Sequence, residues 1–214
     1  MLPGPMTRGV PLPNDLATAS VEDLFRDAGA LREGHFRLKS GLHSPRYLEK
    51  FLVLQYPTLA SELCRRMAKK VIHEAPNVVV GPTTGGVLLA FETARHLSAL
   101  LGWEVRGLFA EPVGLGSGRE LRRGFEVSRG DTVVLVDDIL TTGSSLRETA
   151  EAVERAGGRA SAAVVMVDRS SEPVEIGVPV LAVGRIEIAA WQPRYCPLCD
   201  AGDWLETPGS SGSL

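Results

Sequence analysis

Residues 133–145 read VVLVDDILTTGSS. The β-branched and aliphatic run predicts a buried strand over residues 132–136. Two adjacent carboxylates, Asp137 and Asp138, end this strand, and a turn of hydroxyl residues and glycine follows. Residues 146–156 then have helical spacing and stop at a Gly-Gly pair, which is typical of a helix C-terminus. The segment therefore predicts a strand, a polar turn and a helix in direct succession.

The turn has the composition of a phosphate site. Thr141, Thr142, Ser144 and Ser145 supply hydroxyl donors, and Gly143 lets the backbone approach an anion because no Cβ intervenes. The amide groups of the turn and of the helix N-terminus attract the same anion. No lysine follows the glycine, so the segment is not a Walker-type phosphate loop.

The acidic pair indicates a sugar or a metal ion beside that phosphate. Adjacent carboxylates at a strand end repel each other and need a cation or hydroxyl donors as partners. Asp137 and Asp138 could accept hydrogen bonds from ribose hydroxyls, directly or through a metal-bound water. The pair alone would suit a buried strand that runs into a capped helix. Because the hydroxyl turn follows it directly, the pattern favours a functional site over a purely structural one.

Outside this segment, apolar strands alternate with helices. Further strands are predicted at residues 77–80, 105–109, 121–127, 160–167 and 178–188. Helices are predicted at residues 58–74 and 87–101, and a first helix begins at Ser20, keeps its spacing to Leu31 and stops at Gly34. Leu59, Leu63 and Met67 share one helix face, which is either core or dimer interface. The alternation predicts an α/β fold with a mostly parallel sheet covered by helices on both faces, and ligands at the strands' carboxyl ends.

Composition excludes several classes of protein. The net charge of −3 gives no basic field for nucleic acid, and no apolar run is long enough to cross a bilayer. The N-terminus has no apolar signal segment, so we expect a soluble cytoplasmic protein that binds neither nucleic acid nor membrane. Residues 1–19 are rich in Pro and Gly and predict a flexible leader; residues 207–214 predict a flexible tail.

Cys196 and Cys199 form a single C-x-x-C. Zinc would need two more ligands, and neither the third cysteine nor any histidine has a paired spacing that supplies them. These other candidates are Cys64, His35, His43, His73 and His96. A redox motif would stand at a helix start near a strand-helix-strand unit, which the tail does not suggest. The sequence therefore favours a packed tail over a zinc site.

Residues 133–145 resemble the phosphoribosyl-pyrophosphate motif of type I phosphoribosyltransferases. Four other segments resemble the orotate branch of that family, and the similarity covers roughly residues 20–208. They are residues 34–50 (GHFRLKSGLHSPRYLEK), 81–86 (GPTTGG) and 121–127 (LRRGFEV), and the strand end Val167-Asp168-Arg169; the C-x-x-C tail resembles a subgroup. The resemblance implies one domain over residues 20–206, with a small hood built from the N- and C-terminal segments.

The resemblance also implies the substrates, phosphoribosyl pyrophosphate and orotate, and a role for each matching residue. The phosphoribosyl pyrophosphate site would comprise Lys39, Thr84, Gly85, Asp137, Asp138, Ile139, Leu140, Thr141, Thr142, Gly143, Ser144 and Ser145, with Thr83 beside the pyrophosphate. The orotate site would comprise Tyr47, Leu48, Thr141 and Arg169. Mg²⁺ would be held through the substrate and the acidic pair, and a homodimer is expected. For Arg169 the pairing is also chemically sound, because a guanidinium binds a carboxylate in bidentate fashion.

The chain departs from the family pattern in the loop over residues 110–120. Such loops usually carry Arg, Lys and often His toward the pyrophosphate, but here Pro112 follows Glu111 and Arg119 is the only cation. Arg119 therefore joins the acidic pair as the third expected catalytic residue, with Arg122 and Arg123 as possible substitutes. Three hypotheses stay open: an orotate enzyme, an enzyme for another base such as a purine, and a non-catalytic sensor.

Overall fold

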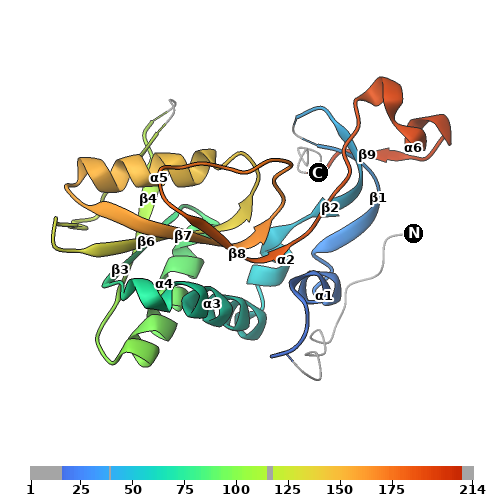
Figure 1. Cartoon of the computed structure of the whole chain (residues 1–214). Coiled ribbons are helices and arrows are strands. Elements are labelled where there is room, and N and C mark those ends of the chain that lie inside the picture. The colour runs from blue at the N-terminus through green and yellow to red at the C-terminus, as the bar shows by residue number, and fades with distance from the viewer. Residues whose placement is uncertain (1–15, 39, 115–117, 209–214) are drawn as a thin grey trace. The chain divides into compact units, whose positions relative to one another are not determined.

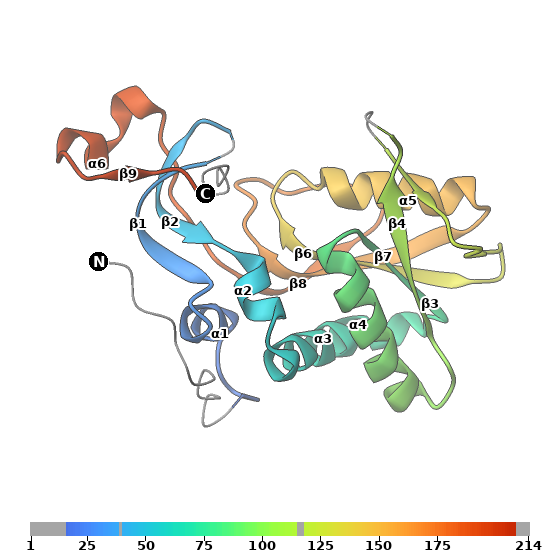
Figure 2. The same cartoon turned by 180° about the vertical axis from the view of Figure 1, so that it is seen from behind.

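The computed structural model describes residues 16–38, 40–114 and 118–208 (Figures 1 and 2). The chain divides into two compact units. Unit 1 contains both ends of the chain, Met1–Val53 and Ile188–Leu214, and unit 2 is Leu54–Glu187. The expected leader and tail lie largely outside the described residues, since residues 1–15 and 209–214 are not among them.

Unit 2 is built on a six-stranded sheet with the order β5-β4-β3-β6-β7-β8. Its strands are β3 (Val78–Pro82), β4 (Arg106–Pro112), β5 (Arg119–Leu121), β6 (Thr132–Leu140), β7 (Arg159–Asp168) and β8 (Val180–Arg185). All neighbouring strands run parallel except β4 and β5, which are antiparallel. The predicted α/β class with a mostly parallel sheet is confirmed.

Three helices cover the two faces of this sheet (Figure 1). The helices α3 (Pro57–Val71) and α4 (Gly85–Leu101) pack on one face, and α5 (Ser144–Arg155) packs on the other. Short helical turns precede and follow α3, namely α2 (Lys50–Leu54) and η1 (Ile72–Glu74). Leu59, Leu63 and Met67 are fully buried, so their face of α3 is core and not a free dimer interface.

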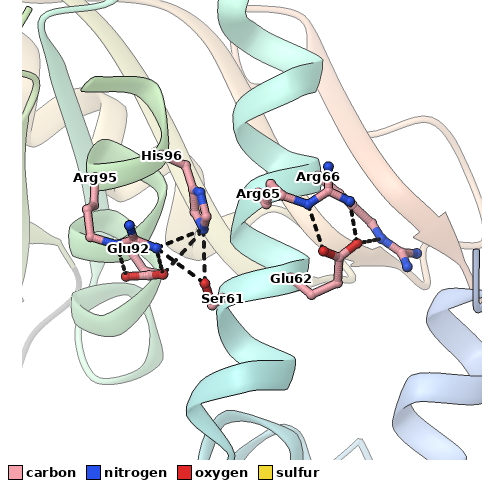
Figure 3. A network of polar contacts seen from close by, with 7 residues as sticks. All are labelled: Ser61, Glu62, Arg65, Arg66, Glu92, Arg95 and His96. Atoms are coloured by element: carbon pink, nitrogen blue, oxygen red, sulfur yellow. Dashed lines mark hydrogen bonds and ion pairs between the residues drawn. The ribbon is translucent and has the colours of Figure 1, made fainter. Parts of the chain in front are cut away.

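Polar contacts accompany the packing of α3 and α4 (Figure 3). Glu92 accepts hydrogen bonds of 2.6 and 2.9 Å from the guanidinium of Arg95. The Nε2 atom of His96 lies 3.0 Å from Ser61 Oγ, which joins the two helices. The hydrogen bond from Arg95 lowers the pKa of the Glu92 carboxyl to about 2. The network therefore holds Glu92 ionised far below neutral pH.

Unit 1 contains a small sheet with the order β2-β1-β9. Its elements are α1 (Val21–Asp27), β1 (Leu31–Arg37), β2 (His43–Leu48), η2 (Pro193–Tyr195), α6 (Pro197–Asp200) and β9 (Leu205–Glu206). The strand β1 is antiparallel to β2 and parallel to β9. Arg32 and Glu206 form two hydrogen bonds of 2.9 and 2.7 Å across this last pair. The C-terminal segment therefore packs against a hairpin from the N-terminal part of the chain.

The structure corrects two predicted elements. The first helix does not reach Leu31: it ends at Asp27, because Gly29 adopts a left-handed φ of 67° and turns the chain into β1. The strand predicted at 121–127 is wrong. Here β5 ends at Leu121, and Arg123 takes a φ of 65°, which breaks an extended run.

Within the described part of the chain, no helix is both long and apolar enough to cross a bilayer.

Candidate active site

The acidic pair lies at the carboxyl end of β6. Asp137 and Asp138 are 7% and 4% exposed, although both are carboxylates. Each is held by main-chain amides: Asp138 N donates to Asp137 Oδ1, and Ile139 N donates to Asp138 Oδ1, both at 2.8 Å. Leu140, the last residue of β6, is buried beneath the turn that follows. The strand and the local hydrogen bonds thus fix the direction of both carboxylates.

The hydroxyl turn connects β6 directly to α5. Gly143 precedes the helix with a φ of 72°, and a Cβ at this position would lie 2.4 Å from Val174 Cγ1. Only glycine fits this left-handed, crowded position without a shift of its neighbours. Thr141, Thr142 and Ser144 are exposed. Thr142 Oγ1 lies 3.3 Å from Ser144 Oγ, and the first amides of α5 have no intrahelical acceptor, so this exposed turn can offer the donors that a phosphate site requires.

The loop after β3 lies next to the acidic pair. Because β3 and β6 are parallel neighbours, their carboxyl ends meet at one edge of the sheet. Gly85 opens α4, and a Cβ on it would lie 2.4 Å from Asp138 Oδ2. Gly81 and Gly86 approach each other equally closely, since a Cβ on Gly81 would lie 2.4 Å from Gly86 O. The glycines of GPTTGG therefore allow this loop to reach the Asp138 carboxylate.

Arg119 is directed toward the same loop. It pairs with Pro112 across the β4–β5 hairpin, and its guanidinium lies 3.2 Å from Ala110 O and 3.4 Å from Thr83 O. Its Nε atom lies 3.4 Å from Glu148 Oε2 on α5. The sequence placed Arg119 in a loop; the structure places it in β5, with its side chain beside the predicted pyrophosphate residue Thr83.

The two other arginines of this region pair with acidic residues of the hairpin. Arg122 pairs with Glu120, and Arg123 pairs with Glu111 at 2.8 Å. Both guanidinium groups are largely exposed. Of the three candidates, Arg119 is therefore the one whose contacts connect it with the loop after β3.

Arg169 follows β7, the parallel neighbour of β6. Its main-chain amide donates to Leu140 O at 2.9 Å, so it lies beside the residue that precedes Thr141. Asp168, one residue earlier, accepts a hydrogen bond of 2.6 Å from Ser170 Oγ and pairs with Arg185 at 3.1 Å. The contacts of Asp168 with Ser170 and Arg185 order the segment after β7 and thereby support the position of Arg169 near Thr141.

The remaining predicted site residues belong to unit 1. Tyr47 and Leu48 are the last residues of β2, and the ring of Tyr47 lies 5.7 Å from that of Phe36. Lys39 lies outside the described residues. These three residues stay an expectation of the family resemblance.

Sequence reasoning missed the segment that supports the hydroxyl turn. Val174 and Ile176 would lie 2.4 and 3.2 Å from a Cβ on Gly143, so they form the wall behind this turn. Neither belongs to a strand or a helix. No period in the sequence marks these residues, and only the fold brings them to the site.

The donor set at the end of β6 suits Mg²⁺. Magnesium prefers oxygen ligands and keeps several waters, so it is commonly held by one or two carboxylates and a substrate phosphate. Asp137 and Asp138 supply carboxylates, and Asp138 Oδ2 occupies the place that a side chain on Gly85 would take. The residues present therefore fit the ion that the family resemblance implies.

Comparisons with known proteins identify the family of this chain. The family model described as the phosphoribosyl transferase domain matches residues 56–195. Fold and site together therefore define a phosphoribosyltransferase.

The relatives narrow the class. The orotate phosphoribosyltransferase of Pelotomaculum thermopropionicum is 42% identical over 87% of this chain and 94% of its own length. That of Heliobacterium modesticaldum is 44% identical over 89% and 96%. A crystal structure of orotate phosphoribosyltransferase from Aeropyrum pernix shares the fold, with a TM-score of 0.61 at 24% identity over 78% of this chain and 93% of that one. The chain belongs to the orotate phosphoribosyltransferase family.

Proposed function

We propose that the chain transfers the phosphoribosyl group of phosphoribosyl pyrophosphate to orotate, giving orotidine 5′-phosphate and pyrophosphate. One observation carries the proposal: a buried acidic pair, an exposed hydroxyl turn and a glycine loop meet at the carboxyl edge of one parallel sheet. In the reaction, the bond from C1′ to a pyrophosphate oxygen breaks and a bond from C1′ to a ring nitrogen forms.

The 5′-phosphate would bind the turn over residues 141–145. The hydroxyls of Thr141, Thr142, Ser144 and Ser145 donate to its oxygens, together with the amides at the start of α5. The positive end of the helix dipole favours the same anion. Gly143 contributes its main chain only, and Ile139 and Leu140 connect this cradle to the acidic pair.

The ribose would lie against the acidic pair. Asp137 and Asp138 accept hydrogen bonds from its two hydroxyls, which fixes the sugar while C1′ develops positive charge. When bound through these carboxylates and the substrate, Mg²⁺ supplies positive charge that offsets the pyrophosphate's negative charge.

The pyrophosphate would leave toward the loop after β3. Thr83, Thr84 and Gly85 face it with hydroxyl and amide donors at the start of α4. Arg119, next to Thr83, supplies the positive charge that the family's loop usually takes from several cations. Lys39 would add a further contact to the phosphoribosyl group.

The base would bind between Thr141 and Arg169. The guanidinium of Arg169 suits the carboxylate of orotate, a feature that purines and uracil lack. The main chain at Tyr47 and Leu48 would complete this subsite, as the family resemblance implies. We extend the proposal to a cytoplasmic homodimer; exposed Leu88 and Phe91 on α4 support self-association, which light scattering can measure.

A substrate panel tests this function. Pyrophosphate release would be measured with orotate, adenine, guanine, hypoxanthine and uracil in turn, with Mg²⁺ present. Orotate alone should support rapid release, and the double variant Asp137→Asn with Asp138→Asn should be inactive. Preference for a purine would contradict the proposal and support the second hypothesis, an enzyme for another base. Tight binding of phosphoribosyl pyrophosphate without turnover on any base would indicate a sensor.

A further inference from the structure

Four side chains that commonly bind metals converge in unit 1, far apart in the sequence. They are His35, His43, Cys196 and Cys199, and their ligand atoms all lie within 4.8 Å of one another. His35 is in β1, His43 begins β2, and the two cysteines flank the start of α6. This cluster takes no part in the proposed transfer reaction.

The distances match the edges of a tetrahedral site. Zinc bonds of about 2.0–2.1 Å to nitrogen and about 2.3 Å to sulfur imply N···N, N···S and S···S edges of about 3.3, 3.6 and 3.8 Å. His35 Nε2 and His43 Nδ1 are 3.0 Å apart, and His43 Nδ1 and Cys199 Sγ are 3.2 Å apart. The two sulfur atoms lie 3.4 and 3.7 Å from His35 Nε2. One ion at the centre would reach all four atoms with small adjustments.

Hydrogen bonding alone does not account for the cluster. His35 Nδ1 lies 3.1 Å from Asp203 O, and a carbonyl only accepts, so Nδ1 carries the proton. In the neutral ring, Nε2 then holds a single lone pair in the ring plane, yet three ligand atoms surround it within 3.7 Å. A central cation would accept a lone pair from each of the four ligand atoms. The contact to Asp203 is also the outer-shell hydrogen bond that orients metal-binding histidines.

The fold holds these four side chains in place. The register of β1 and β2 shifts between Glu33 and Phe36, which allows the consecutive residues His35 and Phe36 both to be buried. The main chain of His43 forms two hydrogen bonds of 2.8 Å with Trp191, which brings the C-terminal segment alongside. Cys199 N then donates to Cys196 O at 3.1 Å and turns both thiols to the same side.

We propose that these residues bind one structural Zn²⁺ ion. Two imidazoles and two thiolates are a ligand set that zinc prefers, whereas Mg²⁺ requires oxygen ligands. Two thiolates neutralise the ion, so the complex is neutral at a place where His35, His43 and Cys196 are at most 4% exposed and only Cys199 of the four is exposed. The protein fills all four positions and leaves none for substrate, which is the mark of a structural site.

The ion would tie the C-terminal segment to the β1–β2 hairpin. Unit 1 has a small sheet, and its two parts are separated by the whole of unit 2 in the sequence. Small units with little core commonly rely on a metal or a disulfide. Zinc would thereby stabilise β2, the strand that carries Tyr47 and Leu48, without contacting a substrate.

Metal analysis of the full-length protein tests the site. Protein purified without added chelator should contain one zinc per chain by mass spectrometry. Cys199→Ser and His43→Gln should lose it. The matched controls Cys64→Ser and His73→Gln should keep it, because neither residue belongs to the cluster. Wild-type protein without zinc, or controls that lose zinc as fully as the site variants, would overturn the proposal.

Cobalt binding keeps the test decisive if the site variants fold poorly. Wild-type protein stripped with a chelator and titrated with Co²⁺ should develop the visible absorption of a tetrahedral thiolate complex at one equivalent. Added Zn²⁺ should displace this signal, and the thermal midpoint should rise on refilling. A stripped, reduced protein that binds no Co²⁺, or a native Cys196–Cys199 disulfide without zinc, would refute the assignment.

Discussion

The approach of Gly85 to the acidic pair yields a quantitative prediction for Gly85→Ala. An added Cβ would lie 2.4 Å from Asp138 Oδ2, whereas ordinary contact begins near 3.4 Å. The carboxylate must therefore move by about 1 Å, because the loop main chain is held against Gly81 by the Gly81–Gly86 approach. The side chain can rotate, but its bond to Ile139 N is then lost. The change should alter the site more than the fold.

The expected effect on the reaction follows from that displacement. A misplacement of about 1 Å at a reacting group can lower the rate about 100-fold, which corresponds to about 2.7 kcal/mol. Because Asp138 would hold the ribose in the ground state and more strongly as C1′ develops positive charge, the Michaelis constant for phosphoribosyl pyrophosphate should rise while kcat falls.

The assay is steady-state pyrophosphate release with orotate, together with thermal unfolding of each protein. Gly130→Ala is the matched control, since a Cβ on Gly130 meets no atom within 4 Å. It should keep full activity and an unchanged thermal midpoint. If Gly85→Ala were as active as this control at equal stability, the acidic pair would not hold the substrate as proposed.

Three further predictions address single side chains. Arg119→Ala should lower kcat/KM with orotate roughly 10-fold to 100-fold through loss of charge at the pyrophosphate, whereas Arg122→Ala should leave it unchanged; equal losses would contradict the assignment. Glu92 has a pKa lowered from 4.5 to about 2 by Arg95, so it contributes stability above its unfolded pKa that is lost as the pH falls through the folded value. Urea unfolding should therefore show Glu92→Gln destabilised by about 1–2 kcal/mol at pH 7, with a difference that shrinks from about pH 4.5 toward pH 2. Burial raises the pKa of Cys64 to about 12, so iodoacetamide should label it at neutral pH only after unfolding; rapid labelling of the native chain would show that this part of α3 opens.

Local patterns predicted most elements of unit 2 but failed where a backbone turn intervened. The helix over residues 58–74 and the strand over 160–167 correspond closely to α3 with η1 and to β7, because a long period of apolar residues survives in any tertiary context. The strand expected at 121–127 failed, since its apolar positions enclose Arg123 and Gly124, both of which adopt positive φ. A positive φ at arginine is rare, so no pattern of residue types announces it.

The C-x-x-C tail shows a different limit of sequence reasoning. Spacing along the chain does not mark His35 and His43 as ligands, because known zinc motifs place paired ligands on one turn or one helix. In the structure the two histidines come from adjacent antiparallel strands, and a register shift brings His35 inward. Spacing along the chain therefore carries no information about such a pair.

The contiguous unit of strand, acidic pair, hydroxyl turn and helix was determined by residues 133–156 alone. The hydrogen bonds that shape its acidic pair and its turn join residues close in the sequence, so propensity, local hydrogen bonding and glycine geometry favour this succession of elements. Tertiary structure decided that Gly85 lies beside Asp138 and that Arg119 lies beside Thr83. Within unit 1 it also decided that the side chains of His35, His43, Cys196 and Cys199 come together. Those contacts depend on strand order and register, which arise only when distant segments bury their apolar faces together.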